Sequence, residues 1–153
     1  LDWAEIESAQ VGLPPELAAH YHPYPYLHEI AAAFSVADLV ISRAGASTLG
    51  EYPFYGLPAI LVPYPYAWRY QKVNADYLAQ RGAAIIIENA DLANKLLPAI
   101  RELMRDKQRR EQMRQTMRSL HRPQAAEAIA NILRQLGQGE PDKKRPTLTL
   151  WLA

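Results

Sequence analysis

The chain has no cysteine among its 153 residues, which excludes a disulfide framework and a metal site built on thiolates. It also has no long apolar run, because its longest ones, "AILV" and "AAIII", are far too short to span a bilayer. Nor is either charge in strong excess, since 17 Lys and Arg stand against 16 Asp and Glu, for a net charge of +1. A globally basic nucleic-acid-binding protein is therefore not expected, and we predict no nucleic acid among the partners.

Apolar residues make up 49% of the chain, which is enough to bury the core of one domain of this length. The first ten residues, "LDWAEIESAQ", are polar and acidic and do not resemble a signal peptide. These features favour a cytoplasmic α/β domain. Because the chain begins with Leu1 rather than Met, we also expect a further segment upstream.

Short apolar runs alternate with segments of helical periodicity along most of the chain. Strands are predicted at Tyr24–Leu27 and within the runs 37–45, 58–65 and 83–87. Helices are predicted, weakly at first, at 1–23 with a break at 12–15, and then at 28–35, 47–55, 70–83, 91–106, 107–120 and 122–137. Three glycines are expected to end helices: Gly56, Gly82 and Gly137. Asp91 is expected to cap the helix at 91–106.

Continuously apolar strands that alternate with helices indicate a parallel sheet that is covered on both faces. We therefore predict an α/β fold, a Rossmann-like parallel sheet flanked by helices and with fewer strands than a full Rossmann sheet has. Such sheets bind ligands at the carboxyl ends of their strands. One domain is expected over residues 1–136, and a flexible tail over 137–153, where the sequence is rich in Pro, Gly and charge before it turns apolar.

The turn "RAGAST", residues 43–48, lies where a predicted strand ends and a helix begins. Gly45 allows close approach of the backbone to a ligand, while Ser47 and Thr48 place hydroxyls beside the amide N–H groups at the helix start. With the helix dipole, this arrangement suits a phosphate or a diphosphate. The same residues also fit an ordinary strand-to-helix turn with a Ser/Thr cap, so both interpretations are open at this point.

Three polar side chains follow at spacings that suit a sugar. Glu51 lies about one helical turn beyond the turn, and its carboxylate can accept hydrogen bonds from the paired hydroxyls of a ribose; it also fits a capping box. Gln71 and Asn74 share one helix face and can reach one sugar ring, although each amide alone also fits a solvated surface position.

Together, Arg-x-Gly-Ala-x-Thr, then Glu51, then Gly-Leu-Pro-Ala, an apolar run to Pro, and finally Gln-x-x-Asn-Ala resemble one family. They resemble the donor-binding half of the MurG-type UDP-N-acetylglucosamine transferases, in glycosyltransferase family 28, over about residues 20–136. The resemblance implies the C-terminal half of a GT-B glycosyltransferase, incomplete here. It implies an inverting enzyme of peptidoglycan synthesis that uses UDP-N-acetylglucosamine, with no cofactor and no bound metal.

The resemblance also assigns residues to the donor. It implies that the backbone of Leu27 contacts the uracil, that residues 45–48 contact the diphosphate and the sugar, and that Glu51 holds the ribose hydroxyls. It implies that Gln71 contacts the hydroxyls of the N-acetylglucosamine. The full implied set is Tyr26, Leu27, Arg43, Gly45, Ala46, Ser47, Thr48, Glu51, Gln71 and Asn74.

The chain departs from the family's pattern in several places. Tyr70 stands where the family usually has His or Gln, and Pro53 interrupts the helix that carries Glu51, where we expect a kink. The family's Gly-Gly-Ser loop and its N-terminal domain, with the acceptor site and the catalytic base, do not occur. We therefore expect no catalytic residue in this chain, which would be inactive alone, and a partner N-terminal domain in cis or as a separate chain.

The resemblance implies an undecaprenyl-linked acceptor at the membrane surface, and with it a cytoplasmic protein that is peripheral to the inner face of the plasma membrane. One alternative is a non-catalytic remnant or a subunit of a split glycosyltransferase. Another is a different glycolipid transferase of family 28. The sequence upstream of the chain would discriminate among these hypotheses.

Other residues have both a functional and an ordinary interpretation. We interpret the histidines as surface residues: His20, His22, His28 and His121. The basic region 101–118 suits anionic lipid, but its interspersed acids favour a solvated face. Trp68 fits either a cover over a sugar face or packing. Core positions are predicted at Leu103, Met104, Met113 and Met117.

Overall fold

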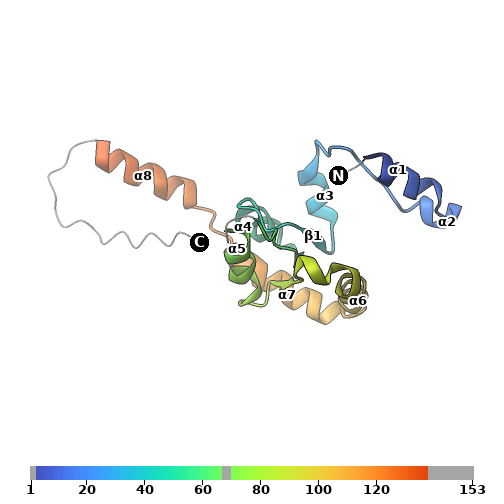
Figure 1. Cartoon of the computed structure of the whole chain (residues 1–153). Helices are drawn as coiled ribbons and strands as arrows, with labels where there is room; N and C mark the ends of the chain where they lie inside the picture. Colours follow the sequence, from blue (N-terminus) through green and yellow to red (C-terminus); the bar gives the residue numbers. More distant parts are fainter. Residues whose placement is uncertain (1–2, 67–69, 138–153) are drawn as a thin grey trace. The chain divides into compact units, whose positions relative to one another are not determined.

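The computed structural model describes residues 3–66 and 70–137 (Figure 1). Trp68 and the expected tail beyond Gly137 therefore lie outside the described residues. The elements in chain order are α1 (Trp3–Val11), α2 (Pro15–Ala18), α3 (Ile30–Val36), β1 (Val40–Ser42), α4 (Thr48–Tyr55), β2 (Ala59–Leu61), α5 (Tyr70–Ala79), β3 (Ala84–Ile86), the 3₁₀ turn η1 (Asn89–Asp91), α6 (Leu92–Arg105), α7 (Lys107–Ser119) and α8 (Ala125–Gly137).

The chain divides into two units, 1–33 and 34–153, with the boundary inside α3. In the first unit, α1 and α2 have no buried residue, and the side chain of Gln10 donates a hydrogen bond to the carbonyl of Tyr21 at 3.3 Å. The strand predicted at Tyr24–Leu27 is wrong, because these residues are irregular. Pro25 lies inside this segment and Pro23 just before it, and neither has an N–H to donate, which disfavours the hydrogen-bond ladder of a strand.

The second unit contains a three-stranded parallel sheet in the order β1-β2-β3. Ile60 in the middle of β2 pairs with Ile41 of β1 on one side and with Ile85 of β3 on the other. Because parallel neighbours need a crossover connection, α4 joins β1 to β2 and α5 joins β2 to β3. The predicted Rossmann-like arrangement is confirmed for this unit.

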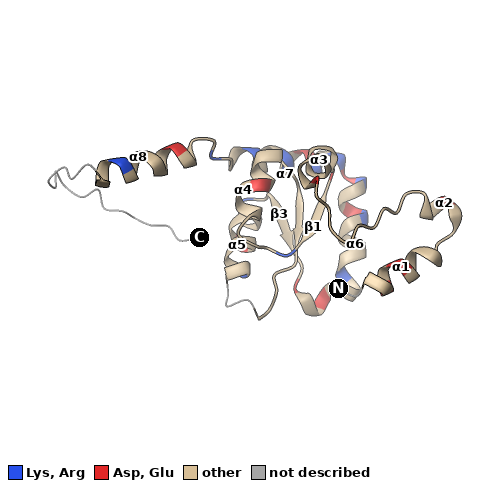
Figure 2. Cartoon of the chain, turned by 90° about the horizontal axis from the view of Figure 1, so that it is seen from above, with Lys and Arg blue, Asp and Glu red and all other residues tan. Residues whose placement is uncertain are grey.

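Helices lie on both faces of the sheet (Figure 2). The side chains of β2 alternate between these two faces. Ala59 and Leu61 are buried in the cluster that includes residues of α4 and α5. Ile60 is buried on the other face, against Leu103 of α6 and Met113 of α7. Burial on both faces explains why β2 is continuously apolar.

The predicted core positions of α6 and α7 are confirmed with one exception. Leu103, Met113 and Met117 are at most 4% exposed, but Met104 is 47% exposed. Helix α6 packs a single stripe of side chains against the sheet, and Met104 lies beside that stripe rather than in it.

Two of the predicted glycine stops, Gly56 and Gly82, are confirmed. Gly56 and Gly82 have φ values of 64° and 77°, in the left-handed region that favours glycine. Asp91 does precede α6, but its side chain does not cap the helix and accepts instead from Lys95 Nζ at 2.8 Å. Pro53 is fully buried within α4, which continues through it to Tyr55.

Candidate functional site

The carboxyl ends of the three strands are joined by one side chain. Arg43 follows β1, and its Nη1 donates to the carbonyl of Val62, after β2, at 3.2 Å. The same nitrogen donates to Oδ1 of Asn89, after β3, at 2.8 Å. Its guanidinium also lies over the ring of Tyr64, 5.4 Å from the centroid. Arg43 therefore organises the edge at which parallel sheets bind ligands.

The β1–α4 loop, residues 43–47, is held from both sides by buried polar groups. Asn74, only 5% exposed, donates from Nδ2 to the carbonyl of Ala44 at 3.1 Å. Thr48, only 3% exposed, donates from its hydroxyl to the carbonyl of Gly45 at 2.6 Å. Both side chains were predicted to contact the nucleotide-sugar. In the structure, each instead donates a hydrogen bond to a backbone carbonyl of this loop.

The start of α4 leaves a row of amide groups free. The amides from Thr48 to Glu51 donate to carbonyls of the preceding turn, at 2.9 to 3.2 Å. Within the part of the chain that the structure describes, the amides of Gly45, Ala46 and Ser47 donate no hydrogen bond. The side chain of Ser47, at the N-cap, is likewise exposed and makes no capping bond. Free amides at a helix start form a site suited to an anion.

Glu51 lies in the first turn of α4, exposed to solvent, and forms no ion pair within the described residues. The neighbouring Tyr52 is buried, and its hydroxyl donates to Oγ of Ser42 in β1 at 2.8 Å. Burial raises the pKa of Tyr52; the hydrogen bond with Ser42 opposes this shift, and the negative charge of Glu51 adds to it. The Tyr52–Ser42 bond fixes α4 against the sheet, and with it the turn that carries Glu51.

Gln71 lies one residue into α5, next to the exposed Tyr70. Its Oε1 accepts a hydrogen bond from the amide of Tyr64 at 2.8 Å, which ties α5 to the loop after β2. Its Nε2 group has no partner within residues 3–66 and 70–137. The structure thus places Gln71, Asn74 and the β1–α4 loop at the same end of the sheet.

A pocket of about 660 Å³ adjoins the start of α4. Residues of the β1–α4 loop, the outer face of α4 and the link from α7 to α8 line it: Ala46, Ser47, Leu49, Gly50, Glu51, Phe54, Tyr55, His121, Arg122 and Ala125. His121 was predicted as a plain surface residue, but it is half-buried, with its ring edge-on to Phe54 at 5.3 Å. No spacing in the sequence could have joined this link to α4, because their proximity arises only from packing.

The two remaining predicted donor residues belong to the first unit. Tyr26 is 72% exposed and its ring lies edge-on to that of His28, with 4.7 Å between the centroids. Leu27 is half-buried. The prediction that both contact the same donor as the β1–α4 loop stays a prediction.

In the described ranges, no group of three or more His, Asp or Glu side chains could hold a metal ion. No helix among the same residues is both long enough and apolar enough to cross a membrane.

The model of the glycosyltransferase family 28 C-terminal domain matches residues 4–140. The chain belongs to this family. The predicted resemblance to the MurG-type transferases is confirmed by relatives and by a solved structure.

Two relatives are UDP-N-acetylglucosamine–N-acetylmuramyl-(pentapeptide) pyrophosphoryl-undecaprenol N-acetylglucosamine transferases. The one from Desulforudis audaxviator is 46% identical over 118 residues, which are 75% of this chain and 32% of the relative. The one from Halothermothrix orenii is 41% identical over 130 residues, 84% of this chain and 35% of the relative. The chain thus spans about a third of the length of these relatives.

Solved structures agree on the fold. Acinetobacter baumannii MurG matches with a TM-score of 0.67 and 31% identity, over 73% of this chain and 33% of that one. The glycosyltransferase VinC, solved in complex with dTDP, matches with a TM-score of 0.62 over 87% of this chain and 32% of its own. At 23% identity, the likeness to VinC shows the fold alone. The family 28 domain therefore has the sheet-and-helix arrangement of GT-B glycosyltransferases.

Proposed function

We propose that this family 28 domain binds UDP-N-acetylglucosamine as the donor half of an inverting N-acetylglucosaminyltransferase. The acceptor would be lipid-linked muramoyl-pentapeptide, in peptidoglycan synthesis. The observation that carries the proposal is the row of free amides at Gly45, Ala46 and Ser47, with the unpaired carboxylate of Glu51 one turn further on. The names of the relatives in the comparison support the choice of donor and acceptor.

In this proposal the polar groups of the site have different tasks. The free amides of the β1–α4 loop bind the diphosphate, and the carboxylate of Glu51 accepts from the ribose hydroxyls. The unpartnered Nε2 of Gln71 donates to the transferred sugar. Arg43, Thr48 and Asn74 act as positioning residues, because their polar atoms hold the loop and the strand ends.

The same arrangement can favour the reaction as well as binding. As the glycosidic bond to the diphosphate breaks, negative charge grows on the departing UDP. Fixed amide dipoles at the start of α4 stabilise this charge without having to reorganise. The base that deprotonates the acceptor would come from the N-terminal domain, so we expect the chain alone to bind donor without transferring it.

The proposed acceptor also sets where the domain would act. A donor domain whose partner domain handles an undecaprenyl-linked acceptor would work at the cytoplasmic face of the plasma membrane, as a peripheral protein. Its partners would be UDP-N-acetylglucosamine, the lipid-linked acceptor and the N-terminal domain, in cis or as a separate chain.

Calorimetric titration of the purified chain with UDP-N-acetylglucosamine tests the proposal. We expect saturable binding that is stronger than that of UDP-glucose. Glu51→Gln should weaken it about tenfold, or ~1.4 kcal/mol, because an amide offers one acceptor oxygen where the carboxylate offers two charged ones. Glu16→Gln is the matched control, since it removes the same charge from an exposed residue of α2.

The outcomes separate the hypotheses. A folded chain that binds no UDP-sugar would overturn the proposal and favour a non-catalytic remnant. Equal affinity for both sugars would retain the nucleotide site but favour another glycolipid transferase of the family. Unchanged affinity in Glu51→Gln would remove Glu51 from the site.

A further inference from the structure

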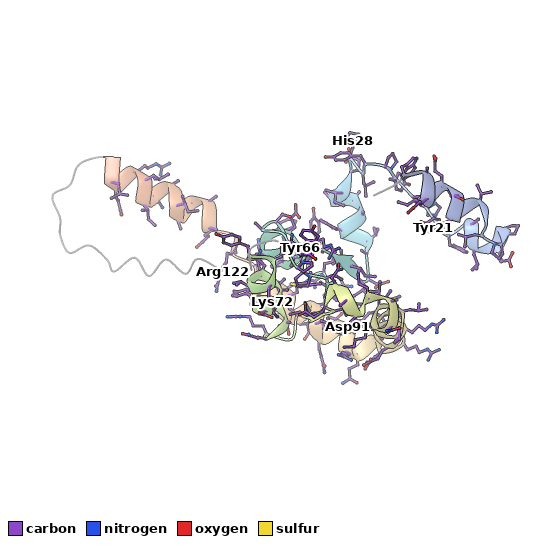
Figure 3. The ribbon with its side chains drawn as sticks, viewed as in Figure 1. Tyr21, His28, Tyr66, Lys72, Asp91 and Arg122 are labelled. Carbon is purple, nitrogen blue, oxygen red and sulfur yellow. The ribbon has the colours of Figure 1, made fainter. Side chains whose placement is uncertain are left out.

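The pocket beside α4 contains a cation that the sequence pattern did not assign to any role. Arg122 lies in the link between α7 and α8, at the base of α8 (Figure 3). It lines the pocket together with Ser47 and Glu51. Within the described residues, Arg122 forms no ion pair and donates no side-chain hydrogen bond. In particular, it does not pair with Glu51, although both line the same pocket.

Other arginines near the sheet are engaged with the protein itself. Arg109 pairs with Glu102, and Arg110 donates to the carbonyls of Leu103 and Met104 at 2.6 Å. Arg114 of α7 also binds inside the protein, to the carbonyl of Gly56 and to the carboxylates of Asp38 and Glu111. Arg122 differs from these three because its side chain makes no such bond within the described residues.

The backbone around Arg122 is well fixed. The carbonyl of Arg122 accepts from the amide of Ala125 at 3.1 Å, which forms the first turn before α8. Pro123 follows directly and restricts the conformation of Arg122. On the other side, the amide of His121 donates to the carbonyl of Arg118 at 3.1 Å. The imidazole ring of His121 packs on Phe54 of α4. The guanidinium is thus presented by a turn that is anchored to α4.

We propose that Arg122 binds the diphosphate of the nucleotide donor, together with the free amides of Ala46 and Ser47. This inference rests on the proposed function and adds a residue to its site. A guanidinium can donate two parallel hydrogen bonds to phosphate oxygens, which backbone amides alone do not offer. Its charge also offsets the repulsion between the diphosphate and the carboxylate of Glu51 in the same pocket.

The assignment predicts an effect that depends on the phosphates of the ligand. Arg122→Gln should weaken binding of UDP at least tenfold, and should reduce the salt dependence of that binding. Binding of uridine, which has no phosphate, should stay unchanged. Arg122→Lys should restore part of the affinity, because it keeps the charge and loses the paired donors.

The experiment uses the whole chain, with calorimetry for UDP and ligand-observed NMR for uridine. Arg134→Gln is the matched control, because Arg134 is an exposed arginine of α8 whose removal costs the same charge outside the pocket. Thermal unfolding of each variant shows whether the fold is retained; a variant that does not fold is replaced by Arg122→Lys in the comparison.

Each result bears on one claim. If the wild type binds UDP and Arg122→Gln binds it equally well, Arg122 has no part in the site, while the proposed function stands. If UDP and uridine lose the same factor, Arg122 contacts the nucleoside, and the diphosphate assignment is wrong. If the wild-type chain binds neither UDP nor the UDP-sugar, the proposed function fails, and this inference fails with it.

Discussion

At the scale of single residues, the end of α4 depends on a glycine. Gly56 has a φ of 64°, and the amides of Gly56 and Leu57 close the helix end onto the carbonyls of Pro53 and Tyr52. A Cβ at this position would lie 2.5 Å from Cγ and Nε of Arg118. We expect Gly56→Ala to lower the free energy of unfolding by about 1–3 kcal/mol, from backbone strain and this close contact.

Urea unfolding of the wild type and the variant measures this change. Gly50→Ala is the matched control, because Gly50 lies inside the same helix and a Cβ there would meet nothing within 4 Å. That substitution is expected to raise stability by about 0.5–1 kcal/mol, through helix propensity. Equal midpoints for Gly56→Ala and the wild type would contradict the argument.

Individual side chains are also where the sequence says least about the site. The motif marks Thr48 and Asn74 as positions of interest, and both do lie at the β1–α4 loop. Their roles could not be predicted, because spacing does not tell whether a hydroxyl or an amide points to a ligand or to a backbone carbonyl. Arg122 carried no signal at all, since nothing in the sequence relates it to α4.

At the scale of elements, the apolar runs predicted all three observed strands. Gly56 and Gly82 predicted where α4 and α5 end. Periodicity succeeds there because β2 is buried on both faces, and because α6 and α7 each bury one stripe of side chains. The strand at 24–27 failed for the opposite reason. Its residues are mostly exposed and have no neighbour to pair with among the described residues.

The contact between α4 and β1 is expected to be sensitive to high pH. The pKa of Tyr52 is raised in the folded protein, chiefly by burial. Its contribution to stability is therefore complete below the pKa of the unfolded state, about 10. It is lost as the pH rises through the higher folded-state pKa, because the unfolded chain loses the proton first.

Tyr52→Phe tests this contact. At neutral pH the variant should lose about 1 kcal/mol, from the hydrogen bond with Ser42. Above a pH of about 10, the difference from the wild type should shrink, because the variant has no buried phenol to ionise. Urea unfolding over this pH range measures it, with the exposed Tyr66→Phe as control. Parallel profiles for the variant and the wild type would show that Tyr52 does not titrate with unfolding.

At the scale of the whole molecule, the second unit leaves surfaces that have no partner in the described structure. Strands β1 and β3 each pair with only one neighbour there. Helix α8 exposes a row of apolar side chains along one face: Ile129, Ile132, Leu133 and Leu136. The exposed fraction of Leu136 is 72%. Open strand edges and continuous apolar faces are both sites of association.

We therefore expect the isolated chain to self-associate through the apolar face of α8. Sedimentation equilibrium should give an average mass above 17.3 kDa that rises with protein concentration. The double substitution Ile132→Gln with Leu136→Gln should bring the mass back toward that of the monomer. Both positions are exposed, so the variant should keep its stability within about 0.5 kcal/mol.

The control for this prediction lies on the opposite face of the same helix. Asn131→Ser with Gln135→Ser changes two exposed polar residues of α8 and should leave the association unchanged. If the glutamine variant still associates as the wild type does, the open edges of β1 and β3 are the contact instead. A wild-type chain that stays monomeric at all concentrations would contradict the prediction that these surfaces associate.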